Sequence, residues 1–142
     1  MPSPFTLPAR DTPISVVVAD DVVEIQQLLH QWLRDLGFLV TCVSTGQEAV
    51  RVLRTVQVDM IITDILMPDG DGLEVITEFR RAQPSVRIIA ISGGGNHLRA
   101  TECLKFARGL GAHGVLMKPF KREQLIDLVT EQLAAGASAK SH

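Results

Sequence analysis

The sequence has no run of lysine and arginine, and no apolar stretch long enough to cross a membrane. Its formal net charge is -2 over 142 residues, which offers no basic surface for direct contact with nucleic acid or anionic lipid. The N-terminal residues lack the basic and then apolar order of a signal peptide. We therefore expect a cytoplasmic protein that binds neither nucleic acid nor a membrane.

Cysteine and histidine are also scarce. The two cysteines, Cys42 and Cys103, show no framework of disulfide spacings, and together with the four histidines they form no zinc motif. Reduced structural thiols fit a cytoplasmic location. The chain is otherwise ordinary, with 46% apolar and 21% charged residues in a length typical of one globular domain.

Short apolar segments alternate with helical patterns along the chain. The segments predicted as strands are 14–19, 38–43, 58–63, 86–91 and 113–117. The helical patterns occupy 25–36, 45–56, 73–82, 98–110 and 121–134. Apolar residues spaced three and four apart from Ile25 to Leu36 indicate the first helix, and a capping box of Thr45 and Glu48 marks the start of the second.

This alternation predicts the doubly wound α/β class, in which helices cover both faces of a five-stranded parallel sheet. The first residues are rich in proline and the last are small and polar, and neither stretch is periodic. We expect a flexible N-terminal arm at 1–12, one folded domain at 13–134 and a flexible C-terminal tail at 135–142.

Polar residues follow four of the predicted strands at the carboxyl end of the sheet. They are Asp20, Asp21, Asp64, Ser92 and Lys118. Ligands of open parallel sheets bind beyond this end. A single aspartate there is usually a helix cap or a turn residue. Three acids, a hydroxyl and an amine at one rim instead predict a functional site.

The residue types at this rim indicate a particular chemistry. Mg²⁺ binds one or two protein carboxylates together with water and phosphate oxygens, and it would relieve the repulsion among Asp20, Asp21 and Asp64. A carboxylate beside such an ion can attack phosphorus and form an aspartyl phosphate. The amine of Lys118 and the hydroxyl of Ser92 supply the further cation and donor that phosphoryl transfer requires.

Four stretches together carry a family resemblance: VVVADDVVEIQQLL, VDMIITDILMPDGDGLEVI, IIAIS and LGAHGVLMKPF. In this order and spacing, over about residues 14–133, the chain resembles the receiver domain of bacterial two-component response regulators. It is similar to the stand-alone, chemotaxis-regulator type. The resemblance implies a flavodoxin-like sheet with strand order 2-1-3-4-5. It also implies that Asp64 accepts a phosphoryl group from a histidine kinase or a histidine phosphotransfer protein.

The resemblance further implies how the rim residues divide their roles. It assigns Asp21, Asp64 and the backbone carbonyl of Leu66 to Mg²⁺, with Asp20 assisting mainly through water.

A switch is implied as well. Ser92 is the hydroxyl that moves to the phosphoryl oxygen, Lys118 pairs with the phosphoryl group, and the Lys118–Pro119 bond is cis. The phosphorylated protein signals through a changed surface near its fourth helix, fifth strand and fifth helix. It catalyses only its own phosphorylation and dephosphorylation, so we do not class it as an enzyme.

The chain departs from the usual receiver pattern in several places, among them Val115 and the glycines after the fourth strand. The residue three before the lysine is often Tyr or Phe in receivers and is Val115 here, so the output surface must respond by a route other than a rotating ring. After the fourth strand, Gly93–Gly95 suits a flexible lead into the next helix or a backbone cradle for phosphate. We favour the flexible lead because no GK[ST] motif follows.

Two other functions use similar residues. A Mg²⁺-dependent phosphatase with an aspartyl nucleophile usually has an acid two residues after it, and that residue is Leu66 here. A phosphorylation-independent interaction module usually lacks one of the acids or the lysine, whereas this chain has them all. Only Val115 favours the module, so the main hypothesis is a phosphoacceptor.

Overall fold

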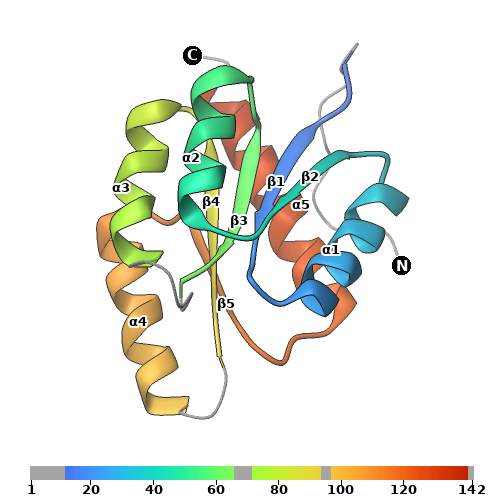
Figure 1. Cartoon of the computed structure of the whole chain (residues 1–142). Helices are drawn as coiled ribbons and strands as arrows, with labels where there is room; N and C mark the ends of the chain where they lie inside the picture. Colours follow the sequence, from blue (N-terminus) through green and yellow to red (C-terminus); the bar gives the residue numbers. More distant parts are fainter. Residues whose placement is uncertain (1–11, 66–71, 94–96, 141–142) are drawn as a thin grey trace.

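The computed structural model describes residues 12–65, 72–93 and 97–140 (Figure 1). Strands and helices alternate along the chain. In chain order they are β1 (Ser15–Ala19), α1 (Val23–Asp35), β2 (Leu39–Val43), α2 (Gly46–Thr55), β3 (Met60–Asp64), α3 (Gly72–Ala82), β4 (Arg87–Ser92), α4 (His97–Leu110), β5 (Gly114–Met117) and α5 (Arg122–Lys140).

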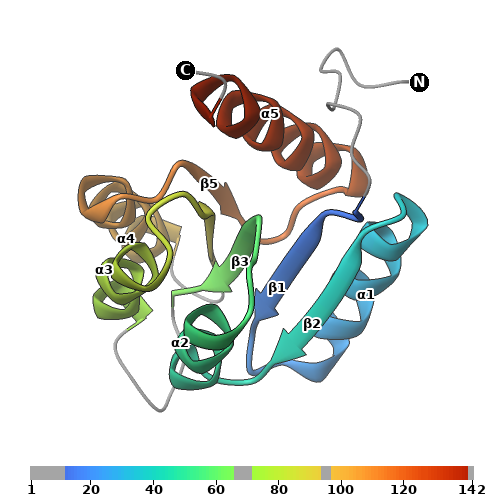
Figure 2. The same ribbon diagram turned by 90° about the horizontal axis from the view of Figure 1, so that it is seen from above.

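The strands form one parallel sheet in the order β2-β1-β3-β4-β5. Helices α1 and α5 cover one face of this sheet, and α2, α3 and α4 cover the other (Figures 1 and 2). The predicted α/β class and the strand order are therefore confirmed. The short connections turn at the carboxyl ends of the strands, which places the residues that follow them along one rim.

The alternation of side chains along β1 explains why two helical layers are needed. Val16 and Val18 pack with Leu29 of α1 in one core cluster, while Val17 and Ala19 belong to the cluster on the opposite face. All four β1 side chains are essentially inaccessible to solvent. A strand buried on both faces must be apolar at consecutive positions, as the sequence is here.

A buried glutamine provides hydrogen-bond partners for backbone carbonyls at the end of α2. The side-chain nitrogen of Gln83 donates to the carbonyls of Leu53, at 2.7 Å, and Val56, while its oxygen accepts from the N–H of Val58 at 2.9 Å. The last carbonyls of a helix have no partner within it. Gln83, directly after α3, therefore provides hydrogen bonds for carbonyls at the end of α2 and holds the segment that leads into β3.

Helix α5 is longer than the sequence pattern predicted, because it runs to Lys140 rather than ending at residue 134. Alanine has the highest intrinsic helix propensity, and residues 135–140 contain three alanines that an analysis of apolar spacing overlooks. Gly136 is buried, and a Cβ there would lie 2.9 Å from the Cδ of Arg87. The domain limits at 13–134 stay a prediction, and the predicted arm lies almost wholly outside the described residues.

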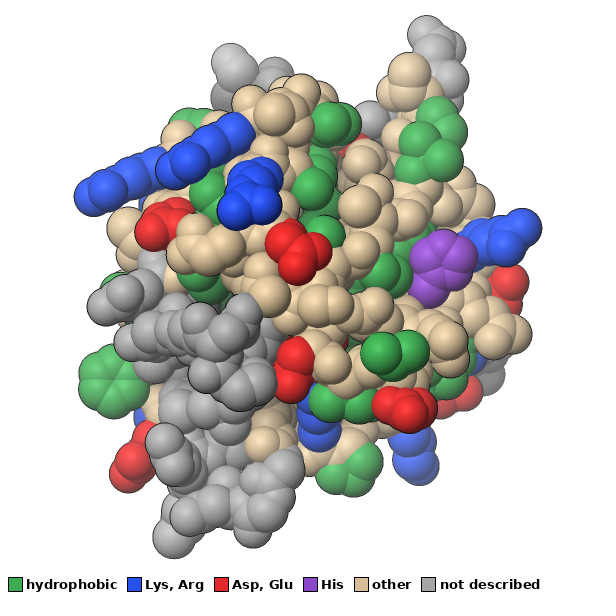
Figure 3. All heavy atoms as spheres, viewed as in Figure 1, with side chains coloured by type: hydrophobic (Ala, Val, Ile, Leu, Met, Phe, Trp, Pro, Cys, Tyr) green, Lys and Arg blue, Asp and Glu red, His purple; other side chains and the backbone are tan. Residues whose placement is uncertain are grey.

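The surface carries charges of both signs on the face shown in Figure 3. Within the described ranges, no helix combines the length and the apolar character needed to span a bilayer. Trp32 of α1 packs edge-on against Phe120, which precedes α5, with the ring centroids 6.3 Å apart. This contact joins α1 to the segment that leads into α5.

Candidate functional site

The five predicted rim residues lie at the carboxyl end of the sheet. Asp64 and Ser92 end β3 and β4, while the other three directly follow β1 and β5. Carboxylate oxygens of Asp20, Asp21 and Asp64 lie within 4.8 Å of one another. The Lys118 Nζ lies 2.9 Å from Oδ2 of Asp64 and 3.1 Å from Oδ2 of Asp20. The structure therefore brings the three acids and the lysine into one cluster.

Every hydrogen-bonding group of Asp20 has a partner. Its backbone N–H donates to the carbonyl of Val43 at 3.1 Å, and its carbonyl accepts from the side-chain amide of Gln26. Carboxylate Oδ1 accepts from the N–H of Val22 at 2.9 Å, and Oδ2 accepts from Lys118. Asp20 is fully buried. Its carboxylate is thus fixed in direction before any ligand arrives.

The electrostatics of the cluster follow from burial and from the paired charges. Burial raises the pKa of Asp20 above its usual value, an effect that the Val22 N–H and the Lys118 charge oppose and that the Asp64 charge reinforces. For Lys118, burial alone would lower the pKa, but the hydrogen bond and charge of Asp64, and then Asp20, raise it above its usual value. Lys118 therefore stays an ammonium at the site at neutral pH.

The acids suit a hard divalent cation. Asp64 is 5% exposed and Asp20 is buried, but Asp21 is exposed, so the cluster has one side open to solvent. Carboxylate oxygens at these separations are the ligands that Mg²⁺ prefers, and a hexahydrated ion must reach them from water. The residues present fit Mg²⁺. Leu66 lies outside the described residues, so the role of its carbonyl stays a prediction.

Ser92 is fully buried, and its Oγ has no hydrogen-bond partner among the described residues. A buried hydroxyl without a partner costs free energy, so such a group in a native site calls for a ligand or a rearrangement. The carbonyl of Ser92 accepts from the N–H of Lys118 at 2.8 Å, which places the two residues side by side. The predicted switch hydroxyl thus lies next to the predicted phosphoryl ion pair.

Gly93 has a packing role that the sequence pattern did not reveal. A Cβ at this position would lie 2.4 Å from the Cβ of Lys118, which is closer than carbon atoms tolerate, and 3.2 Å from its Cα. The absence of a side chain therefore allows Lys118 to reach the acids. In the sequence, the SGGG segment was the feature that could have indicated this packing role. Its other glycines, Gly94 and Gly95, lie outside the described residues.

Two further features, one within β5 and one just after it, bear on the predicted switch. The Lys118–Pro119 peptide bond is cis, as predicted. Val115 pairs with Ala90 of β4 and is partly buried against the core under α2, α3 and α4. On α4, Phe106 is 65% exposed.

Comparison with known proteins identifies the family. The model of the response regulator receiver domain matches residues 16–130, and the chain therefore belongs to this family. Receiver domains act as phosphoacceptors in two-component signal transduction, interact with histidine kinases and are generally not classed as enzymes. This confirms the resemblance drawn from the motifs.

The relatives come in two lengths. The DNA-binding transcriptional regulator NtrC of Azospirillum brasilense is 34% identical over 119 residues, which make up 84% of this chain but only 24% of that protein. The chemotaxis protein CheY of Thermotoga maritima is 26% identical over 82% of this chain and 94% of that protein. The crystal structure of NtrX from Brucella abortus has a TM-score of 0.82 at 25% identity, covering 92% of this chain and 29% of that one. The chain thus spans about a quarter of the NtrC relative.

Proposed function

We propose that Asp64 accepts a phosphoryl group, in the presence of Mg²⁺, from a histidine kinase or a histidine phosphotransfer protein. The observation that carries this proposal is the position of Asp64: its Oδ2 is 2.9 Å from the Lys118 ammonium, and two more carboxylates lie within 4.8 Å. This arrangement surrounds one nucleophilic oxygen with both a cation and a set of metal ligands.

In the proposed reaction, a carboxylate oxygen of Asp64 forms a bond to phosphorus as the bond from phosphorus to the donor's imidazole nitrogen breaks. That nitrogen keeps the electron pair and takes up a proton. Lys118 neutralises charge on the phosphoryl oxygens, and the hydroxyl of Ser92, which has no partner among the described residues, donates a hydrogen bond to one of them.

The metal ion would be bound by Asp21 and Asp64, with the Leu66 carbonyl as a further ligand and Asp20 acting through water. When bound, Mg²⁺ supplies positive charge to the transferring phosphoryl group. Asp20 suits the indirect role because both of its carboxylate oxygens already accept hydrogen bonds from the protein.

Phosphorylation would be read at the surface of α4, β5 and α5. Exposed Phe106 on α4 and partly buried Val115 on β5 belong to this region. Because Val115 replaces the aromatic residue that many receivers have, the signal does not depend on rotation of a ring on β5. Because the proposed phosphoryl donor acts in the cytoplasm, we propose a cytoplasmic location for this protein. Stand-alone action, as in the CheY relatives, stays a prediction, because relatives of both lengths match.

Intact mass spectrometry after incubation with acetyl phosphate tests the proposal. We expect a gain of one phosphoryl mass that requires Mg²⁺, disappears with EDTA and is absent in Asp64→Asn. Asp35→Asn, which neutralises an exposed acid on α1, should label like wild type. Labelling of Asp64→Asn at the wild-type rate would contradict the proposal.

A further inference from the structure

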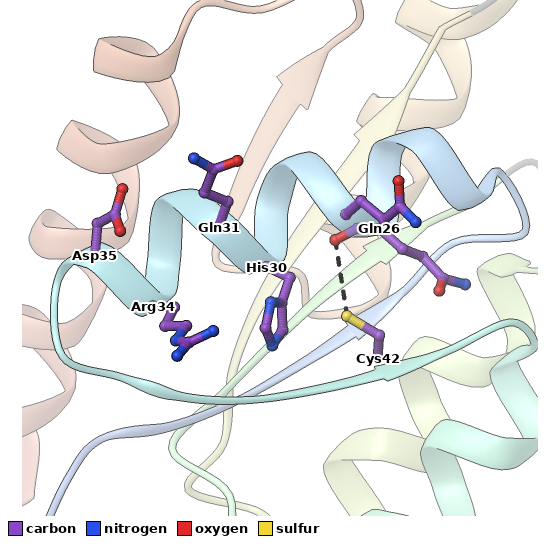
Figure 4. A pocket seen from close by; sticks show the side chains of 7 residues that line it. Gln26, His30, Gln31, Arg34, Asp35 and Cys42 are labelled. Carbon is purple, nitrogen blue, oxygen red and sulfur yellow. Dashed lines mark hydrogen bonds between the residues drawn. The ribbon is translucent and has the colours of Figure 1, made fainter.

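Gln26 contacts the loops that surround the acidic cluster. It lies on α1, half-buried, above the end of the edge strand β2 (Figure 4). Its side-chain nitrogen lies 3.1 Å from the carbonyl of Val43 and 3.2 Å from the Oγ of Ser44, and it also donates to the carbonyl of Asp20. One amide thus joins the loop after β1 to the loop after β2.

The chemistry of these partners fixes which way the amide points. The carbonyls of Asp20 and Val43 can only accept hydrogen bonds, so the NH₂ end of Gln26 must face them. A carboxylate of the same shape would instead place an oxygen against two carbonyl oxygens. The site therefore distinguishes glutamine from glutamate at this position.

The bond to Asp20 bears directly on the metal ligands. The carbonyl that Gln26 contacts belongs to the peptide between Asp20 and Asp21, so its direction sets the plane from which the Asp21 side chain leaves the backbone. Asp21 is exposed, in contrast to buried Asp20. The contact from Gln26 therefore restrains the peptide that directly precedes the Asp21 side chain.

We propose that Gln26 is a positioning residue for the Mg²⁺ site: it orients the Asp20–Asp21 peptide and thereby sets the affinity for the ion. This inference rests on the proposed function, because it assumes that the acids bind Mg²⁺. Residues that orient metal ligands typically contribute about 10- to 100-fold to metal affinity when they are mutated.

The substitution Gln26→Glu gives a test in which charge and position act in opposite directions. An added negative charge near three carboxylates attracts Mg²⁺, and by charge alone it would tighten binding. Loss of the amide contacts weakens binding instead. The displaced side chain has room to turn outward, because Gln26 lines an open groove of about 680 Å³ between α1 and Cys42 of β2.

The control is Gln27→Glu. Gln27 is the next residue of α1, is exposed, and lines the same groove, so its substitution adds the same charge without touching the Asp20 carbonyl. Gln26→Met removes the donor without adding charge, and it carries the test if Gln26→Glu does not fold.

The experiment is calorimetric titration of each purified protein with MgCl₂, with urea unfolding in EDTA as the measure of folding. We expect Gln26→Glu and Gln26→Met to bind Mg²⁺ roughly tenfold more weakly than wild type, and Gln27→Glu to bind equally or more tightly. Wild-type affinity in both Gln26 variants would overturn the positioning role while leaving the proposed function intact. Absence of Mg²⁺ binding by wild type would overturn both.

Discussion

Lys118 is fixed from several directions at once. Its ammonium pairs with Asp20 and Asp64, its backbone N–H donates to the carbonyl of Ser92, and its Cβ packs where a side chain on Gly93 would otherwise be. Such restraint lowers the entropy lost when the amine meets a phosphoryl group. The reach of this lysine thus depends on a neighbour that has no side chain.

The substitution Gly93→Ala tests that dependence at the residue scale. Because a Cβ would collide with the Cβ of Lys118, we expect the free energy of unfolding to fall by about 1–3 kcal/mol. Displacement of the amine should also slow labelling by acetyl phosphate roughly ten- to a hundredfold. Urea unfolding and timed intact mass measure the two effects.

Gly109→Ala is the matched control. This glycine lies within α4, and a Cβ there would meet nothing within 4 Å. Because glycine weakens a helix interior by about 0.5–1 kcal/mol relative to alanine, this variant should be stabilised and should label normally. Normal labelling in Gly93→Ala would show that Lys118 does not need the space.

At the scale of elements, Gln83 connects α2, α3 and β3. Replacing it by methionine keeps the length of the side chain but leaves the N–H of Val58 and the carbonyl of Leu53 without this partner. We expect a loss of about 1–3 kcal/mol in the free energy of unfolding. Amide hydrogen exchange at the end of α2 should rise more than exchange in α1.

Gln57→Met provides the comparison for this element, since Gln57 is exposed and lies in the same connection between α2 and β3. Equal stability of the two methionine variants would mean that the Gln83 bonds contribute nothing net to folding.

These elements also show what the sequence can and cannot predict. The strands and the rim residues were predictable because buried parallel strands are apolar throughout and their carboxyl ends meet at one edge. The roles of Gln26 and Gln83 were not, because amides that bond backbone groups distant in sequence leave no periodic signal. Gly93 looked like a flexible lead, since a pattern of glycines does not reveal which side chain approaches it.

At the scale of the whole molecule, the two ends of the sheet have different chemistry. The acids and Lys118 lie at the carboxyl ends of the strands, whereas His113 lies just before β5 at the amino ends. Its Nδ1 accepts from the N–H of Ile88 at 3.0 Å, which requires a neutral ring. Burial lowers the pKa of His113, and the charges of Arg87 and Arg80 lower it further.

Global stability should therefore depend on pH through His113. Below the ordinary histidine pKa of 6.5, the unfolded chain takes up a proton that the folded state resists. The free energy of unfolding then falls as the pH falls, by at most about 1.4 kcal/mol per pH unit, until the folded pKa is reached. Urea unfolding of wild type between about pH 7.5 and 5, a range that spans the ordinary histidine pKa of about 6.5, measures this pH dependence of the free energy of unfolding.

His113→Asn isolates the contribution, because the asparagine oxygen can accept from Ile88 but does not titrate. The difference in stability between wild type and this variant should shrink with falling pH. A difference that stays constant with pH would rule out His113 as the source. Asp20, with its raised pKa, is present in both proteins and cancels in the comparison.

The edge-on contact between Trp32 and Phe120 gives the protein an intrinsic fluorescent probe close to the site. The chain has one tryptophan and no tyrosine, so indole emission has a single source. That source touches a ring two residues beyond Lys118, across the cis peptide bond. Light emitted from α1 therefore originates beside the segment that carries the amine of the site, and no dye or label is needed to observe it.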